Sequence, residues 1–126
     1  HLRQEEKKLR SEGIAVKQGR QNLIIPFQDI MACYAEDGYT ILLTWDQKKY
    51  FPDRSLDKTE TMLPEEWFFR LNRQVILHRR AISGYTRAGE GKLDILVNGN
   101  GKLPSPIQVS RIKAASFKNW FRLQES

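Results

Sequence analysis

Short apolar runs separated by turn residues fill the chain from Gly13 onward, and this spacing limits the fold more than any other feature. Runs of roughly four to eight residues bounded by Gly, Pro, Asn or Asp are typical of antiparallel strands. The sequence therefore predicts an all-β fold with short helices. In the first half, the expected strands are residues 14–17, 22–26, 30–35, 39–45 and 48–51, and the loops QGRQ and AEDG close two hairpins.

The second half continues this pattern. Residues 81–87 and 92–97 flank AGEG as a further hairpin, and residues 98–101 form a second tight turn. The segment 102–109 contains two prolines, which lack a backbone donor, so we expect an edge strand or a partly irregular segment there. The basic stretch RLNRQVILHRR, residues 70–80, has no clear local preference.

Two short helices are expected among the strands. Ser55 is a favourable N-cap for a helix that runs to about Leu63, and Pro64 ends it. Ser110 has the same role before a C-terminal helix near residues 111–122, where apolar side chains recur at helical spacing. Residues 1–12 are charged and helix-prone, so we interpret them as a linker or tag remnant that precedes one folded domain, residues 13–126.

The residue content narrows the class of protein. Cys33 is the single cysteine, which excludes an internal disulfide and a thiolate metal cage, and we expect it to be a small buried residue. No apolar run approaches the roughly 20 residues of a membrane span, and the start lacks a signal-peptide pattern. We therefore expect a soluble, cytoplasmic domain without membrane contact.

Positive charge is concentrated in the second half of the chain. Residues 1–63 carry ten Lys or Arg and ten Asp or Glu, whereas residues 64–126 carry eleven and five, so the whole net charge of +6 lies there. A one-sided basic segment indicates a polyanionic partner, because neutralising phosphates releases counterions. Charge alone does not separate nucleic-acid binding from a merely soluble basic surface.

Catalytic motifs do not stand out. Two histidines and one cysteine cannot build a metal cage, and neither HExxH nor a paired CxxC occurs. The sequence GNGK, residues 99–102, lacks the remainder of a phosphate-binding loop. We therefore expect no enzymatic activity, no cofactor and no metal.

The basic residues near predicted loops are the best candidates for a binding site. Arg70 and Arg73 flank Asn72, and these side chains can grip guanine or phosphate and read adenine. Arg111 follows a predicted N-cap, where free backbone N–H groups also attract phosphate. The alternatives are that Arg70 pairs with a carboxylate, that Asn72 only closes a turn, and that Arg111 is an ordinary surface residue.

Three blocks together resemble a known family. They are DIMACYAEDGYTILL from Asp29, SLDKTETMLPEEWFFRLNRQVIL from Ser55, and VSR at residues 109–111. In this order they are similar to the LytTR DNA-binding domain of bacterial response regulators, over about residues 13–122. The resemblance implies an elongated fold of about ten strands in small antiparallel sheets with short helices, whose loops enter successive grooves of double-stranded DNA.

The same resemblance implies a partner and a set of contacts. Two domains are expected to bind paired direct repeats, with a receiver or other sensory domain upstream in a two-component regulator. We assign base contacts to Arg73 and Arg111, and phosphate contacts to Arg70, Arg79, Arg80 and Lys113. The remaining candidates are Asp37, Gly38, Tyr39, Thr40 and Asn72. The resemblance thus implies contacts from three segments, which are residues 37–40, the Asn72–Arg73 stretch and Arg111.

The chain departs from the family pattern at four positions, and this bears on the DNA sequence that it recognises. Asn72 stands where relatives usually have histidine, Gln74 where serine is usual, His78 where asparagine is common, and Tyr34 where glutamate is common. His78 is interpreted as structural; on a DNA-facing surface its charge would vary near neutral pH.

Two other functions are open at this point. One is a β-rich module that binds protein or peptide through the proline-containing edge at residues 102–109, with its basic surface serving solubility. The other is single-stranded RNA binding on exposed aromatic side chains, although the Trp and Phe positions are expected in the core. Steep salt dependence favours duplex DNA over the first, and competition with single strands tests the second.

Overall fold

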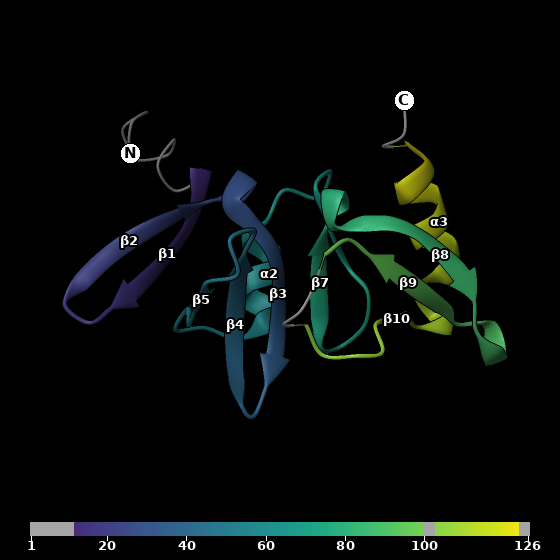
Figure 1. Cartoon of the computed structure of the whole chain (residues 1–126), viewed down its shortest axis with the longest axis horizontal. Coiled ribbons are helices and arrows are strands. Elements are labelled where there is room, and N and C mark those ends of the chain that lie inside the picture. Colours follow the sequence, from purple (N-terminus) through teal and green to yellow (C-terminus); the bar gives the residue numbers. More distant parts are fainter. Residues whose placement is uncertain (1–11, 100–102, 124–126) are drawn as a thin grey trace. The chain divides into compact units, whose positions relative to one another are not determined.

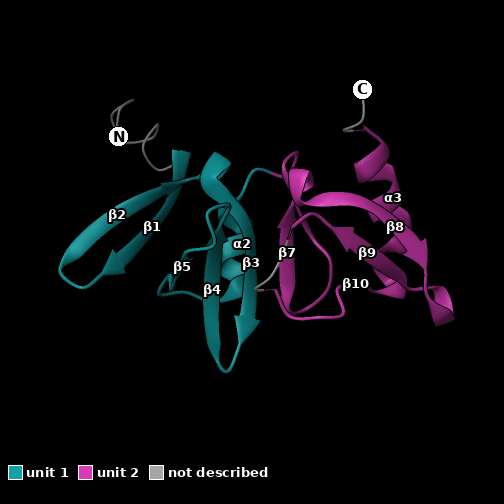
Figure 2. Ribbon diagram, in the orientation of Figure 1, with its two compact units in different colours: residues 1–64 teal, residues 65–126 magenta. Residues whose placement is uncertain are grey.

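The computed structural model describes residues 12–99 and 103–123, which divide between two compact units bounded at Pro64 and Glu65 (Figure 1, Figure 2). Within the described residues the fold is mostly β, with ten strands in small antiparallel sheets and two short α-helices. The expected fold class is therefore confirmed. Apart from Glu12, the expected linker over residues 1–12 lies outside the described residues.

A hairpin opens the first unit. Its strands are β1 (Gly13–Gln18) and β2 (Gln21–Pro26), which pair antiparallel with Gly13 opposite Pro26. A Cβ at Gly13 would lie 2.2 Å from the carbonyl oxygen of Ile25, so only glycine fits this close approach. The hairpin predicted around QGRQ is confirmed.

Three neighbouring strands in the order β5-β4-β3 follow the short 3-10 helix η1 (Phe27–Asp29). They are β3 (Ile30–Glu36), β4 (Tyr39–Thr44) and β5 (Lys49–Tyr50). The β3–β4 turn consists of Asp37 and Gly38, with φ of 52° and 82°. An Asp-Gly pair suits a two-residue hairpin turn, because both positions must adopt a left-handed conformation.

The core of this unit includes β3 and one helix. Residues 30–34 are all buried, and burial raises the pKa of the Cys33 thiol to about 12, as expected of a structural cysteine. Helix α2 (Leu56–Met62) contacts β3 and buries Leu56 and Thr59. The hydroxyl of Ser55 accepts a hydrogen bond of 3.1 Å from the Lys58 amide, which confirms the predicted N-cap.

The second unit begins with a hairpin in the stretch that had no clear local preference. Strand β6 (Phe68–Arg70) pairs antiparallel with β7 (Val75–His78), whose four residues are all buried. A three-residue strand is too short to show a period of two, and the surrounding basic residues hide the apolar run. The 3-10 helix η2 (Arg79–Ala81) then leads into the next sheet.

That sheet has the order β10-β9-β8. Strands β8 (Ile82–Arg87) and β9 (Leu93–Val97) form the predicted hairpin around η3 (Gly89–Gly91). Strand β10 (Gln108–Val109) is shorter than the predicted segment 102–109, because residues 103–107 are irregular around the two prolines. Residues 100–102, part of the predicted turn and edge, lie outside the described residues.

The chain's C-terminal helix lies beside β8 in the same unit (Figure 1), and aromatic side chains meet between the helix and the strands. Helix α3 (Ala114–Leu123) follows a 3-10 turn, η4 (Arg111–Lys113), so the first turn of the predicted helix is wound more tightly than expected. Phe117 is fully buried, with its ring centroid 5.4 Å from Phe69 of β6 and 5.7 Å from Tyr85 of β8. The helix thereby links the hairpin to the sheet.

Candidate nucleic-acid interface

The loop between β6 and β7 is held in shape by Arg70. Its Nε donates to the carbonyl oxygen of Asn72 and its Nη2 to that of Arg73, each at 2.7 Å. Leu71 and Val75 close the base of the loop with a backbone hydrogen bond of 2.9 Å. Arg70 is half-buried and Arg73 is exposed, so the first arginine shapes the loop that presents the second.

Asn72 joins this loop to a segment 36 residues further along the chain. Its Nδ2 donates to the carbonyl oxygen of Gln108 at 2.6 Å, and its Oδ1 accepts from the amide of Gln74 at 2.7 Å. Both ends of the side-chain amide are therefore engaged with backbone groups. This agrees with the alternative in which Asn72 closes a turn. The hydrogen bond to Gln108 also connects that turn to β10.

Two further hydrogen bonds fasten η4 beside the same loop. The Ser110 amide donates to the Leu71 carbonyl oxygen at 3.2 Å, and Lys113 Nζ donates to the Arg70 carbonyl oxygen at 3.2 Å. The structure thus brings together two of the three predicted segments, the Asn72–Arg73 loop and the Arg111 turn. Lys113 is half-buried, and this contact directs its ammonium toward β6.

Arg111 is exposed at the start of η4, and its aliphatic stem lies against the β8–β9 turn. A Cβ at Gly91 would lie 2.8 Å from Arg111 Cγ, so the absence of a side chain at Gly91 makes room for that stem. The predicted cap at Ser110 is corrected: Ser110 occupies the N-cap position, but its side chain makes no capping hydrogen bond in the described structure. Its backbone carbonyl accepts from the Lys113 amide at 3.0 Å instead.

His78 orders the arginines of η2. His78 is 7% exposed, and its Nδ1 accepts a hydrogen bond of 2.9 Å from the Arg80 amide. Burial, together with the nearby charges of Arg80 and Arg79, lowers the pKa of His78 to about 4. His78 is therefore neutral near pH 7 and structural, as interpreted from the sequence, while Arg79 is half-buried and Arg80 is exposed.

The third predicted segment is the β3–β4 turn of the first unit. Asp37, Gly38 and Tyr39 are exposed there, whereas the Thr40 side chain is buried, which leaves Thr40 little surface to offer a partner. Tyr39 is 65% exposed, and its ring meets Phe51 edge-on with 6.1 Å between the ring centroids. Phe51, also exposed, did not stand out from the sequence because the contact depends on how β5 pairs with β4.

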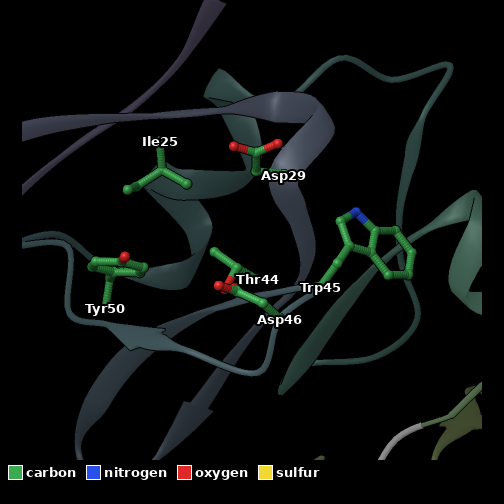
Figure 3. Close-up of a pocket in the computed structure, with 6 residues that line it drawn as sticks. All are labelled: Ile25, Asp29, Thr44, Trp45, Asp46 and Tyr50. Carbon is green, nitrogen blue, oxygen red and sulfur yellow. The ribbon is translucent and has the colours of Figure 1, made fainter.

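A cavity of about 320 Å³ lies elsewhere in the first unit (Figure 3). Trp45 and Tyr50 contribute aromatic walls, and Asp29 and Asp46 contribute carboxylates. A hydrogen bond from the Thr44 hydroxyl, assisted by Lys48, lowers the pKa of Asp46. The acidic lining disfavours a phosphate-bearing ligand. Among residues 12–99 and 103–123, no group of three His, Cys, Asp or Glu side chains is placed to hold a metal.

The family pattern described as the LytTr DNA-binding domain matches residues 20–122. The chain belongs to the LytTr DNA-binding domain family. The family is defined by DNA binding rather than by catalysis, so this LytTr domain is a DNA-binding domain. Its basic second unit, with the Asn72–Arg73 loop fastened beside Arg111, is consistent with that class.

Comparison with solved structures supports the LytTr fold. The chain is similar to the LytTr DNA-binding domain of a putative methyl-accepting/DNA response regulator from Bacillus cereus, with a TM-score of 0.69 and 20% sequence identity. The match covers 85% of this chain and 94% of that one. A comparison with curated protein sequences gave no match. In the described part of this LytTr domain, none of the helices has the length and apolar character needed to cross a membrane.

Proposed function

We propose that this LytTr domain binds specific sequences of double-stranded DNA as the output domain of a bacterial transcription regulator. One observation carries the proposal: the exposed Arg73 and Arg111 lie on two segments that Asn72 and Ser110 fasten to each other. Side chains presented by fixed backbones can meet base edges in a constant register, which sequence recognition requires.

The candidate residues fall into two groups, according to whether their side chains are available to contact DNA or are already bonded within the domain. We assign base contacts to Arg73 and Arg111, and phosphate contacts to the exposed Arg80 and the half-buried Arg79. Arg70, Asn72 and Lys113 already donate to backbone carbonyls, so their main contribution is to order the loops, and Arg70 and Lys113 add positive charge. In the first unit, Asp37, Gly38 and Tyr39 form the second contact surface, and the buried Thr40 supports it.

Selection of bound duplexes from a random pool tests the function directly. We expect a recovered motif of two direct repeats, with one domain bound at each repeat. Arg73→Ala and Arg111→Ala should each lose discrimination at one base pair, by roughly 1 to 3 kcal/mol in anisotropy titrations. Arg20→Ala is the matched control, because Arg20 is exposed in the β1–β2 turn outside these segments. Unchanged discrimination in both variants contradicts the assignment.

The rival role, peptide binding at the sheet edge, is less well supported by this geometry. Strand β10 is the edge of its sheet, but it pairs over two residues only and follows an irregular proline-containing segment. Such a short, blunted edge offers few backbone groups for an added strand. We further propose that a receiver or other sensory domain belongs to the full-length regulator, that residues 1–12 are part of the linker to it, and that the regulator is cytoplasmic.

A further inference from the structure

Ile112 has the highest exposure of the large apolar side chains in the described residues, at 88%. It lies between Arg111 and Lys113 in η4, while Val109, three residues earlier, is fully buried. An isolated exposed apolar side chain is common on protein surfaces and is by itself uninformative. Its neighbours and its rigid support make this one informative.

The backbone on either side of Ile112 is held in place. Ser110 is fastened to Leu71, the Lys113 amide donates to the Ser110 carbonyl oxygen at 3.0 Å, and Lys113 Nζ donates to the Arg70 carbonyl oxygen at 3.2 Å. The turn therefore holds Arg111 and Ile112 at fixed, adjacent positions, and both side chains are exposed. Ile112 thus lies one residue from Arg111, within reach of a partner that Arg111 contacts.

We propose that Ile112 contacts the C5-methyl group of a thymine, one base step from the base pair that Arg111 contacts. The inference rests on the proposed function and adds a specificity-determining residue to it. Successive Cα atoms are about 3.8 Å apart, close to the rise of about 3.4 Å between base pairs. Adjacent residues of a turn can thus reach adjacent base pairs.

The chemistry selects the thymine methyl among the groups that DNA presents. It is the apolar group on the major-groove edge of the bases, and contact with an aliphatic side chain removes both from water. If the Ile112 side chain packed against a phosphate instead, it would displace water from the charged oxygens without replacing the hydrogen bonds that they lose. Ile112 therefore fits the floor of the groove, and the neighbouring guanidinium fits base edges or the adjacent phosphates.

Single thymine-to-uracil replacements in the selected duplex test this, because each removes one methyl group and leaves the hydrogen bonds intact. For the wild-type domain we expect one replacement in each repeat to weaken binding about fourfold, the value of one buried carbon. This position should adjoin the base pair at which Arg111→Ala loses discrimination. Ile112→Ala should bind the thymine and uracil duplexes equally there.

The control is Leu96→Ala, which removes another exposed apolar side chain of the same unit and should leave the thymine preference unchanged. Thermal melting of Ile112→Ala should match that of the wild type, since its side chain is almost fully exposed. An Ile112→Ala variant that retains the thymine preference, or that weakens all duplexes alike, overturns the inference. Failure of the wild-type domain to select any duplex overturns the proposed function instead.

Discussion

At the scale of single residues, several polar side chains form hydrogen bonds with loop backbone groups instead of facing solvent. Arg70, Asn72 and His78 each bond to backbone groups, whereas Arg73 and Arg80, one to three residues away, have exposed side chains. The division follows from burial, because a buried polar group must find a partner whereas an exposed one is solvated. Residue type alone does not reveal which of these polar side chains bonds to the backbone and which is exposed.

Replacing Asn72 with alanine tests its role in ordering the loop. We expect Asn72→Ala to lower the free energy of unfolding by about 1 to 3 kcal/mol, because it removes two hydrogen bonds and leaves the Gln108 carbonyl oxygen without this donor. Chemical denaturation measures this, with the exposed Asn22→Ala as control. Wild-type stability, together with lost discrimination at one A·T pair, would instead show that Asn72 reads a base.

The buried His78 predicts a pH dependence of stability. Its pKa is about 4 in the folded chain, below the ordinary 6.5, so the unfolded chain takes up the proton first. Stability contributed by the neutral ring is complete above about pH 6.5 and is lost as the pH falls toward 4, by on the order of 2 to 3 kcal/mol. Asparagine can also accept from the Arg80 amide. We therefore expect His78→Asn to lose less stability over this range in parallel thermal melts; identical pH profiles would contradict the assignment.

At the scale of elements, short turns place the side chains that longer strands support. The Asp37–Gly38 turn needs two residues in a left-handed backbone conformation. The Ser55 N-cap needs one hydrogen bond, from an amide three residues later in the chain. Both were predictable because all of their partners lie within a few residues. The fit of Arg111 over the β8–β9 turn was not, since Gly91 is distant in sequence and nothing local identifies it as a neighbour.

Gly91→Ala tests whether the β8–β9 turn positions Arg111. The new Cβ would lie 2.8 Å from Arg111 Cγ, and φ at this position is +78°, so we expect a loss of about 1 kcal/mol in stability and weaker discrimination at the base pair assigned to Arg111. Two controls separate these effects. Gly19→Ala has a φ of +62° in open space and reports strain alone, whereas Gly89→Ala meets nothing within 4 Å and should be neutral in binding. Equal DNA binding by all three variants would exclude the positioning role.

At the scale of the whole molecule, the uneven charge sets how binding responds to salt. The second half of the sequence carries the entire excess of +6, so phosphate contacts should concentrate there. Each contact releases condensed counterions, and the logarithm of the binding constant therefore falls linearly with the logarithm of salt concentration.

Arg80→Ala should make that slope less negative by about 0.9 without changing base preference, because its guanidinium is assigned to one phosphate. Anisotropy titrations across a salt series give the slope, and Arg20→Ala should leave it at the wild-type value. A loss of base preference in Arg80→Ala, with an unchanged slope, would reassign Arg80 to the base edges.

Eight of the ten strands, both helices and the basic segments were predictable from the sequence, since apolar spacing, turn residues and caps act over a few residues. The β6–β7 hairpin was missed because its strands are short and its loop is rich in arginine. Tertiary structure alone decided that Asn72 bonds to Gln108, that Arg111 lies over Gly91, and that Ile112 stays in solvent. The physical reason is distance along the chain: these contacts form only after separate hairpins have packed, and no local pattern encodes which partners will then meet.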